Sequence, residues 1–390
     1  MATYPVKYIT NTMRGAPQIS GQAGTLQAAL RTFLLTGFGL TTALSVTVAG
    51  GIATASLNEG QTFAQGCVVL VDGGTPAQIN GEARVLTSSN SAITWATTAP
   101  DGPATGTITI KVAPVGGWEE LFPGTPNKSV FRSIDPQASG FCYRVDDSGT
   151  TQARVRGFES MTDIDTGTGP FPTDTQISGG GYTAKSYSEG ATPVSYLLAA
   201  DSRTVLIAIS SYSSILATYT VAPIRGFGDM LPLAPDGDPY SAAISCNSNS
   251  GTASFGAFGF YRSGAASIYC PRPRGGIGSA VRADTYPYVG NAATVSGADP
   301  KLGAFPSDVD GELKYCRQYI AAGENLTPRA DVPGVLYIPQ TGVGALIKSG
   351  DTLQGSGALA GRTLRAVGAN SSADAEPVGA WLIDVTGPWR

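Results

Sequence analysis

Short runs of alternating apolar and polar residues, separated by glycine-rich turns, recur along most of this chain. Over residues 40–114 the runs are LSVTV, GIATASL, CVVLV, ARVLT, AITWATT and GTITIKV. Turn-forming segments such as VDGGTP, INGE and APDGPATG lie between them. Short strands at this spacing are typical of barrels and sandwiches. We therefore predict a small β barrel or sandwich of five to six strands over residues 40–114.

Residues 115–390 continue the strand pattern. Runs such as FCYRV, ARVRGFES, ASIYC and PGVLYIPQTG predict strands, and YLLAADSRTVLIAISSY predicts two. The segment GELKYCRQYIAAGENL fits either a short helix or a strand. Residues 115–390 as a whole lack the regular alternation of helix and strand patterns that builds a parallel sheet. We predict a second, larger β-rich domain here, and hence a mainly β fold class.

The first 39 residues contain the one good helical pattern. In AGTLQAALRTFLLTGFG, apolar residues recur at positions i, i+4, i+7 and i+8. These residues are Leu26, Leu30, Phe33 and Leu34. Gly37 and Gly39 follow where a helix end is expected. We predict an N-terminal arm over residues 1–39 with one amphipathic helix. Its apolar face either packs on the next domain or forms an assembly contact with a neighbouring subunit.

Composition narrows the range of functions. The chain of 390 residues has only 14% charged residues and a formal net charge of −4, which gives no basis for nucleic-acid binding. The uncharged stretch 32–57 is interrupted by glycine turns, so we predict no membrane span, and MATYPVKYIT does not predict a signal peptide. Histidine, the commonest general base and metal ligand, is absent. We therefore predict a non-enzymatic protein with no catalytic, cofactor-binding or metal-binding residues and no cofactor.

Cysteine spacing argues against a zinc site. The five cysteines are Cys67, Cys142, Cys246, Cys270 and Cys316. They contain no CxxC pair, and their odd number leaves at least one thiol without an intrachain partner. We interpret them as buried free thiols, with interchain disulfides in an assembly as the alternative.

The stretch MTDIDTGTGPFPTDTQISGGGY, residues 161–182, concentrates acidic residues and glycines. It holds Asp163, Asp165 and Asp174. A calcium loop requires about six oxygen ligands at closer spacing, and a phosphate loop requires the pattern GxxxxGK[ST] before a helix. Neither pattern is present, so we interpret this stretch as a rigid surface loop.

Three further groups of residues are candidates for chemistry or binding. Paired carboxylates of the glycosidase type could come from Glu119, Glu120, Asp146, Asp147, Asp308, Asp310 and Glu312. Adjacent acids on a strand point to opposite faces, so we interpret them as solvated turn residues. An aromatic shelf for carbohydrate could come from Phe255, Phe258, Phe260 and Tyr261, although core packing is the default interpretation. The turn PRPRGG offers Arg272 and Arg274 as assembly contacts for an acidic neighbour.

Several longer stretches of the sequence together carry a resemblance to a known class of proteins. They are TMRGAPQISGQAGTLQAALRTFLLTGFG, VTVAGGIATASL, VVLVDGGTPAQINGE, WATTAPDGPATGTITIKVAP, VFRSIDP, YRVDDSGTTQARVRGFESMTDIDTGTGPFPT and DVTGPWR. Spread over nearly the whole chain, these phrases resemble structural proteins encoded in the morphogenesis clusters of tailed bacteriophages and prophages. The resemblance implies a virion component that is made in the cytoplasm of the bacterial host, and it brings no functional residues with it.

We therefore expect a structural subunit of the neck, collar, tail or baseplate, which associates with itself and docks on other virion proteins. Low charge and many small residues suit close packing between β surfaces. A capsid decoration protein is the nearest alternative. A second alternative is a receptor-binding protein, whose 255–261 region or C-terminal domain contacts host glycans. The least favoured is a carboxylate-dependent glycan hydrolase that uses Asp308, Asp310 or Glu312.

Overall fold

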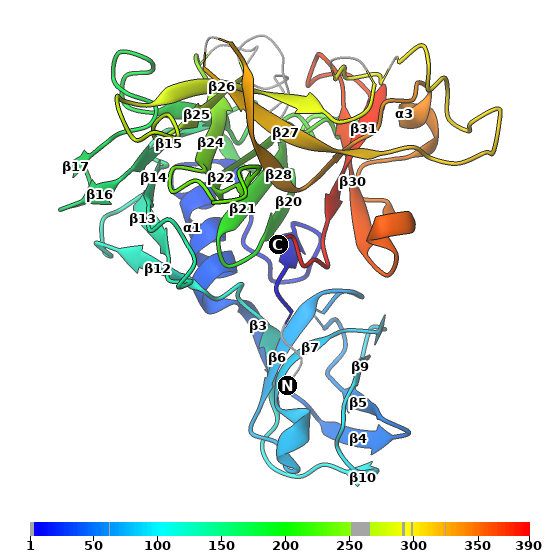
Figure 1. The fold of residues 1–390 in the computed structure, drawn as a ribbon. Helices are drawn as coiled ribbons and strands as arrows, with labels where there is room; N and C mark the ends of the chain where they lie inside the picture. The colour runs from blue at the N-terminus through cyan, green and yellow to red at the C-terminus, as the bar shows by residue number, and fades with distance from the viewer. Residues whose placement is uncertain (1–3, 62, 251–265, 291–292, 298, 324) are drawn as a thin grey trace.

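The computed structural model describes residues 4–61, 63–250, 266–290, 293–297, 299–323 and 325–390. Over these residues the chain is mainly β, as predicted, and the sheets are antiparallel. Figure 1 shows a small unit, which we define as residues 38–112, below a larger unit made of the rest of the chain. None of the helices in the described part of the chain has the length and apolar character that a membrane span requires.

The small unit consists of two sheets. One is formed, in order, by β10 (Gly102–Pro103), β4 (Ser45–Ala49), β5 (Ile52–Ser56), β9 (Ala92–Ala96) and β8 (Thr87–Ser88). The other is formed by β3 (Phe38–Thr42), β11 (Thr109–Val112), β6 (Val68–Asp72) and β7 (Gly81–Arg84), with a 3-10 turn (Ala77–Ile79) before β7. The predicted number of five to six strands is wrong, because nine are present among the described residues. β8 and β10 are only two residues long, too short to produce an alternating pattern.

Alternation explains which side chains point into the small unit. Along β4, Val46 and Val48 are buried, whereas the residues between and beside them are exposed. Ala49 pairs with Ile52, so that only two residues connect β4 to β5. Both are glycines with positive φ, 59° at Gly50 and 77° at Gly51, as a tight turn between twisted strands requires. The strands predicted over LSVTV and GIATASL are therefore confirmed, and they pair as a hairpin.

The larger unit is built on one extended antiparallel sheet. Its strands are β1 (Lys7–Thr10), β12 (Trp118–Leu121), β13 (Lys128–Ser133), β14 (Cys142–Asp146), β15 (Gln152–Phe158), β18 (Gly181–Ala184), β20 (Ser195–Ala200), β21 (Thr204–Ser210), β22 (Ile224–Asp229), β23 (Leu231–Pro232), β24 (Ala242–Asn247), β25 (Ala266–Cys270), β26 (Val281–Pro287), β27 (Cys316–Ala322), β28 (Thr327–Tyr337), β29 (Thr352–Gln354), β30 (Thr363–Ala369) and β31 (Gly379–Asp384). The ambiguous segment GELKYCRQYIAAGENL contains β27 and is therefore a strand.

Short elements complete the larger unit. They are the β2–β19 pair (Ser20–Gly21 and Gly190–Pro193), the β16–β17 pair (Ser160–Met161 and Gly167–Thr168), α3 (Val343–Leu346) and a 3-10 turn (Gly357–Leu359). The core contains an aromatic cluster in which the ring of Tyr143 stacks on Phe227 at 4.9 Å, and Trp118 meets Phe227 edge-on at 6.0 Å. These rings join β12, β14 and β22 across the sheet.

The N-terminal segment is part of the larger unit rather than a separate arm. β1 pairs along its whole length with β20. The predicted helix is present as α1 (Thr25–Arg31), followed by a π-helical turn (Thr32–Thr36), and it packs beside β13 and β2. Its four predicted face residues, Leu26, Leu30, Phe33 and Leu34, are at most 1% exposed. The alternative that they contact a neighbouring subunit is therefore wrong for this conformation, because the chain's own core covers them.

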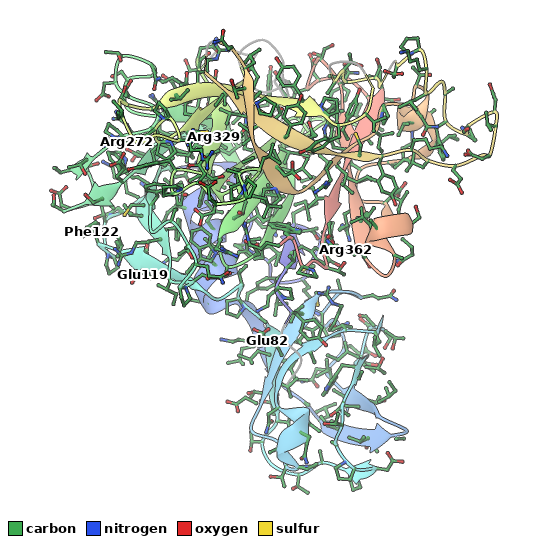
Figure 2. All side chains as sticks on the ribbon, viewed as in Figure 1. Glu82, Glu119, Phe122, Arg272, Arg329 and Arg362 are labelled. Atoms are coloured by element: carbon green, nitrogen blue, oxygen red, sulfur yellow. The ribbon has the colours of Figure 1, made fainter. Side chains whose placement is uncertain are left out.

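A polar contact joins the two units. Lys7 on β1 pairs with Glu82 on β7, the residue labelled at the junction in Figure 2. The same ammonium group donates hydrogen bonds to the carbonyl oxygens of Pro114 at 2.6 Å and Val115 at 3.1 Å. Burial lowers the pKa of Lys7, and the hydrogen bond that Lys7 donates to Glu82 opposes that shift. The segment between β11 and β12 is thus held by one buried cation that three acceptors surround.

Candidate functional site

The acidic residues of the 161–182 stretch pair with arginines and lysines of the neighbouring sheet. Asp165 lies 2.8 Å from the Lys128 ammonium group and 3.1 Å from the Arg144 guanidinium. Asp174 lies 3.0 Å from Arg156, and Asp163 accepts backbone hydrogen bonds within its own turn. Among the described residues there is no group of three or more His, Cys, Asp or Glu side chains that could hold a metal ion. The carboxylates therefore fasten this loop to β13, β14 and β15.

An aromatic anchor fixes the other side of this loop. Phe171 is fully buried, and its ring meets Tyr143 edge-on at 6.2 Å and Phe141 at 5.7 Å. Gly157 exchanges two backbone hydrogen bonds with Phe171. A Cβ atom on Gly157 would lie 2.2–2.5 Å from three ring atoms of Phe171, closer than carbon atoms can approach. The glycine is therefore required for the loop to dock, which supports the interpretation of 161–182 as a rigid loop.

The paired carboxylates are distributed over separate ion pairs. Glu119 pairs with Arg132 at 2.7 Å and Glu120 with Arg31 at 2.8 Å. Asp146 and Asp147 point apart, as expected for a strand: Asp146 lies 3.5 Å from Lys128, whereas Asp147 is buried against Lys185. The interpretation of Asp147 as a solvated turn residue is therefore wrong.

Asp310 and Glu312 share one cation on the surface. Both carboxylates pair with the ammonium group of Lys314. The hydrogen bond from Lys314, together with the backbone N–H of Glu312, lowers the pKa of Asp310 to about 2. A general acid of a glycosidase needs a raised pKa instead. The shift at Asp310 therefore disfavours that role, although it does not bear on Asp308.

The arginines of the PRPRGG turn already have partners within the chain. Arg272, labelled in Figure 2, forms a bidentate pair with Glu159, and its carbonyl oxygen accepts a hydrogen bond of 2.6 Å from Arg329. Arg274 pairs with Asp236 and keeps half of its side chain exposed. To contact an acidic residue of a neighbouring subunit, Arg272 would have to give up its pair with Glu159. The half-exposed Arg274 is partly accessible for such a contact.

The cysteines are free thiols, and four of them are buried. They are Cys67, Cys142, Cys246 and Cys270, whereas Cys316 is partly exposed. Burial raises the pKa of Cys67 and Cys246 to about 12 and that of Cys270 to about 11. In this conformation the chain itself covers the four buried thiols, so an interchain disulfide through any of them would require the fold to open. The aromatic candidates Phe255, Phe258, Phe260 and Tyr261 lie outside the described residues.

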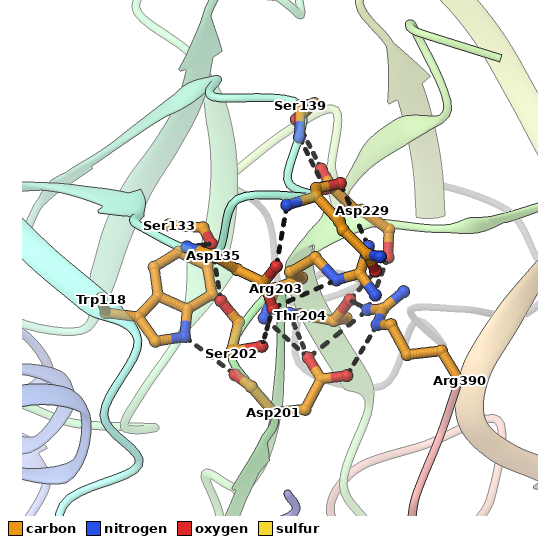
Figure 3. Close-up of polar contacts among 11 residues, drawn as sticks. Trp118, Ser133, Asp135, Ser139, Asp201, Ser202, Arg203, Thr204, Asp229 and Arg390 are labelled. Carbon is orange, nitrogen blue, oxygen red and sulfur yellow. Dashed lines mark hydrogen bonds and ion pairs between the residues drawn. The ribbon is translucent and has the colours of Figure 1, made fainter. Parts of the chain in front are cut away.

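Figure 3 shows a buried polar network that the sequence pattern did not predict. The guanidinium of Arg390 pairs with Asp201 at 2.8 Å and donates to the carbonyl oxygen of Asp229 at 3.1 Å. Asp201 also accepts the backbone N–H groups of Arg203 and Thr204, at 2.8 Å and 2.7 Å. Burial raises the pKa of the Asp229 carboxyl, and hydrogen bonds from Ser139 oppose that shift. Because N–H and O–H donors of the chain occupy both carboxylates, the network ties the last residue of the chain to the β20–β21 turn and to β22.

A second unpredicted feature lies on the outer face of the five-stranded sheet. Its register aligns four threonines across four strands: Thr47 opposes Thr54, Thr54 opposes Thr94, and Thr94 opposes Thr87. Thr47, Thr54 and Thr87 are exposed, and the hydroxyls of Thr87 and Thr94 lie 2.7 Å apart.

The rest of that face is also uncharged, and we call the whole set the threonine face. Its other members are Ser45, Ala49, Ile52, Ser56, Ala92, Ala96 and Pro103. The outer face of the four-stranded sheet, in contrast, carries Asp72, Glu82 and Lys111. The sequence runs LSVTV, GIATASL and AITWATT place Ser or Thr at alternate positions. Which of these residues lie side by side depends on the register between strands.

Comparison of the chain with models of known protein families, and with curated protein sequences, finds no match.

Proposed function

We propose that this protein is a non-enzymatic structural subunit of a tailed-phage particle, at the neck, collar, tail or baseplate, which works by associating with itself and with neighbouring virion proteins. The observation that carries the proposal is the threonine face. Two copies of the chain, each with a net charge of −4, repel one another. Contact through an uncharged sheet face lets them associate without bringing their carboxylates close together. Short hydroxyl and methyl groups also allow two flat sheets to approach closely.

The arrangement of the small unit supports this assignment. Figure 1 shows the small unit below the larger unit. In the small unit, β4, β5, β9 and β10 lie on one side and β3, β6 and β7 on the other. Leu44 and Leu86 are 67% and 41% exposed and directly precede Ser45 and Thr87 of this face. These two side chains add to the apolar area that a partner on the threonine face would cover. The partner we propose is a second copy of the chain.

The first experiment is the mass of the purified protein by light scattering over a range of concentrations. We expect a discrete, closed oligomer of at least two copies, because a face that packs on the same face of a second copy forms a two-fold contact. A charge placed at the centre of the face, in Thr54→Lys, should dissociate it. An unpaired charge in a closed interface costs at least about 3 kcal/mol, or about a hundredfold in affinity.

The matched control is Thr42→Lys. Thr42 is an exposed threonine on the outer face of the four-stranded sheet, opposite Thr109. It should leave the oligomer intact. A wild type that stays monomeric at all concentrations contradicts self-association, and equal dissociation by both variants contradicts the choice of face.

A further inference from the structure

A small pocket lies between strands that are far apart in the sequence. It is bounded by residues at the end of β1, by the β20–β21 hairpin and by β30, and its volume is about 140 Å³. An engineered cavity of about 150 Å³ holds one benzene molecule, so this pocket has room for a ligand of a few heavy atoms.

The lining of the pocket is of two kinds. One wall is apolar and consists of Leu197, Ala208, Ala222, Ala366 and Val367. Hydroxyl groups border it from Thr10, Thr12, Ser195, Ser210, Thr220 and Ser349. Arg365 is the single charged residue among the described residues that line it. A ligand that fits has one charged end and one short apolar end.

Arg365 has no carboxylate partner in the described part of the chain. Arg362, which precedes the same strand, pairs with Asp384 at 2.8 Å. The Nε atom of Arg365, in contrast, is buried and has no hydrogen-bond acceptor among the described residues. Leaving a buried N–H group without an acceptor costs free energy, so an acceptor that enters the pocket beside Arg365 is favoured there.

Tyr8 holds the guanidinium of Arg365 in place. The Cζ atom of Arg365 lies 5.2 Å from the centre of the Tyr8 ring, within the range of a cation–π contact. The Tyr8 hydroxyl in turn donates to the carbonyl oxygen of Gln65 at 3.1 Å. The arginine is thus oriented by a tyrosine that itself spans the junction with the small unit.

We propose that this pocket binds a small monocarboxylate, with its charged end on Arg365 and its aliphatic end against Leu197, Ala208 and Val367. A guanidinium matches the two oxygens of a carboxylate in a planar, bidentate pair. Phosphate would bring up to two negative charges, whereas Arg365 is the single cation among the described residues of the lining. The proposal is independent of the structural role proposed above.

Isothermal titration of the whole protein tests the site with acetate, butyrate, inorganic phosphate and butyramide, the uncharged analogue of butyrate. We expect butyrate to bind with a stoichiometry of one per chain and at least tenfold more tightly than butyramide or phosphate. Equal binding of butyrate and butyramide, or tighter binding of phosphate, overturns the assignment. This comparison uses the wild type alone, so it does not depend on the folding of any variant.

Two variants locate the site. Arg365→Gln should weaken butyrate binding at least tenfold, whereas Arg282→Gln, at an exposed arginine on β26, should bind butyrate as the wild type does. An unchanged affinity in Arg365→Gln overturns the proposal. Circular dichroism of each variant checks that the fold is retained.

Discussion

The buried pair of Lys185 and Asp147 offers the sharpest test of how this fold is held together. Both side chains are 0% exposed. The Oδ2 atom of Asp147 also accepts the backbone N–H groups of Leu26 at 2.8 Å and Gln27 at 3.1 Å, at the start of α1. One carboxylate therefore joins β14, β18 and a helix that lies about 120 residues earlier in the chain.

Removing the cation alone should be costly. Lys185→Met leaves the Asp147 carboxylate buried with only its backbone donors, and breaking a buried pair in this way costs about 3–5 kcal/mol. Asp147→Ala loses about 1 kcal/mol more, because it also removes the cap of α1. Burial raises the pKa of Asp147 and lowers that of Lys185, so desolvation outweighs their attraction in both cases.

The double variant Asp147→Asn/Lys185→Met should therefore be less destabilised than Lys185→Met alone. The asparagine oxygen can still accept from α1, and neither charge remains to be desolvated. We expect a loss of about 1–2 kcal/mol, against about 3–5 kcal/mol for each of the single variants Lys185→Met and Asp147→Asn, and hence a coupling energy of at least about 2 kcal/mol between the two sites. Urea unfolding, followed by circular dichroism and tryptophan fluorescence, measures each value.

The pH dependence gives an independent check. Burial already raises the pKa of Asp147 with Lys185 present, and loss of that cation in Lys185→Met should raise it further. Between the unfolded and the folded pKa, the folded chain then holds a proton that the unfolded chain has lost. The destabilisation should therefore be largest at neutral pH and should shrink as the pH falls toward 4. A cost below about 1 kcal/mol for Lys185→Met, or strictly additive effects in the double variant, would refute this account.

Two further predictions concern the other buried groups. Arg390→Ala should destabilise the chain by about 3 kcal/mol, because it leaves the buried Asp201 carboxylate without its cation. Arg390→Lys should cost less. Equal unfolding midpoints for Arg390→Ala and wild type would contradict the role of the network. A thiol reagent should modify at most one cysteine in the native chain, Cys316, and all five in denaturant, because burial raises the pKa of Cys67 and Cys246 to about 12; rapid modification of several native thiols would contradict the burial.

Local patterns were sufficient for the elements whose side chains alternate or repeat regularly. The β4–β5 hairpin could be predicted because two glycines separate two runs of period two. The apolar face of α1 could be predicted because Leu26, Leu30 and Phe33 follow the helical period. These patterns report which side of an element is buried. They do not report what covers it, and so the sequence left open whether the apolar face of the helix packs on this chain or on a neighbouring subunit.

The features on which the proposals rest depend on contacts between distant parts of the chain. Thr54 is an ordinary exposed strand residue until the register places Thr47 and Thr94 beside it. Arg365 is an unremarkable strand arginine until β30 lies across β20 and β21.

The sequence by itself determined that this protein is mainly β, with one short amphipathic helix and many tight glycine turns, because side-chain alternation and turn chemistry act between near neighbours. Only the tertiary structure decided which charges are paired, which face is uncharged and where a pocket remains. The physical reason is that a shift of one residue in strand register moves every side chain to the opposite face, and the register is set by packing over the whole sheet.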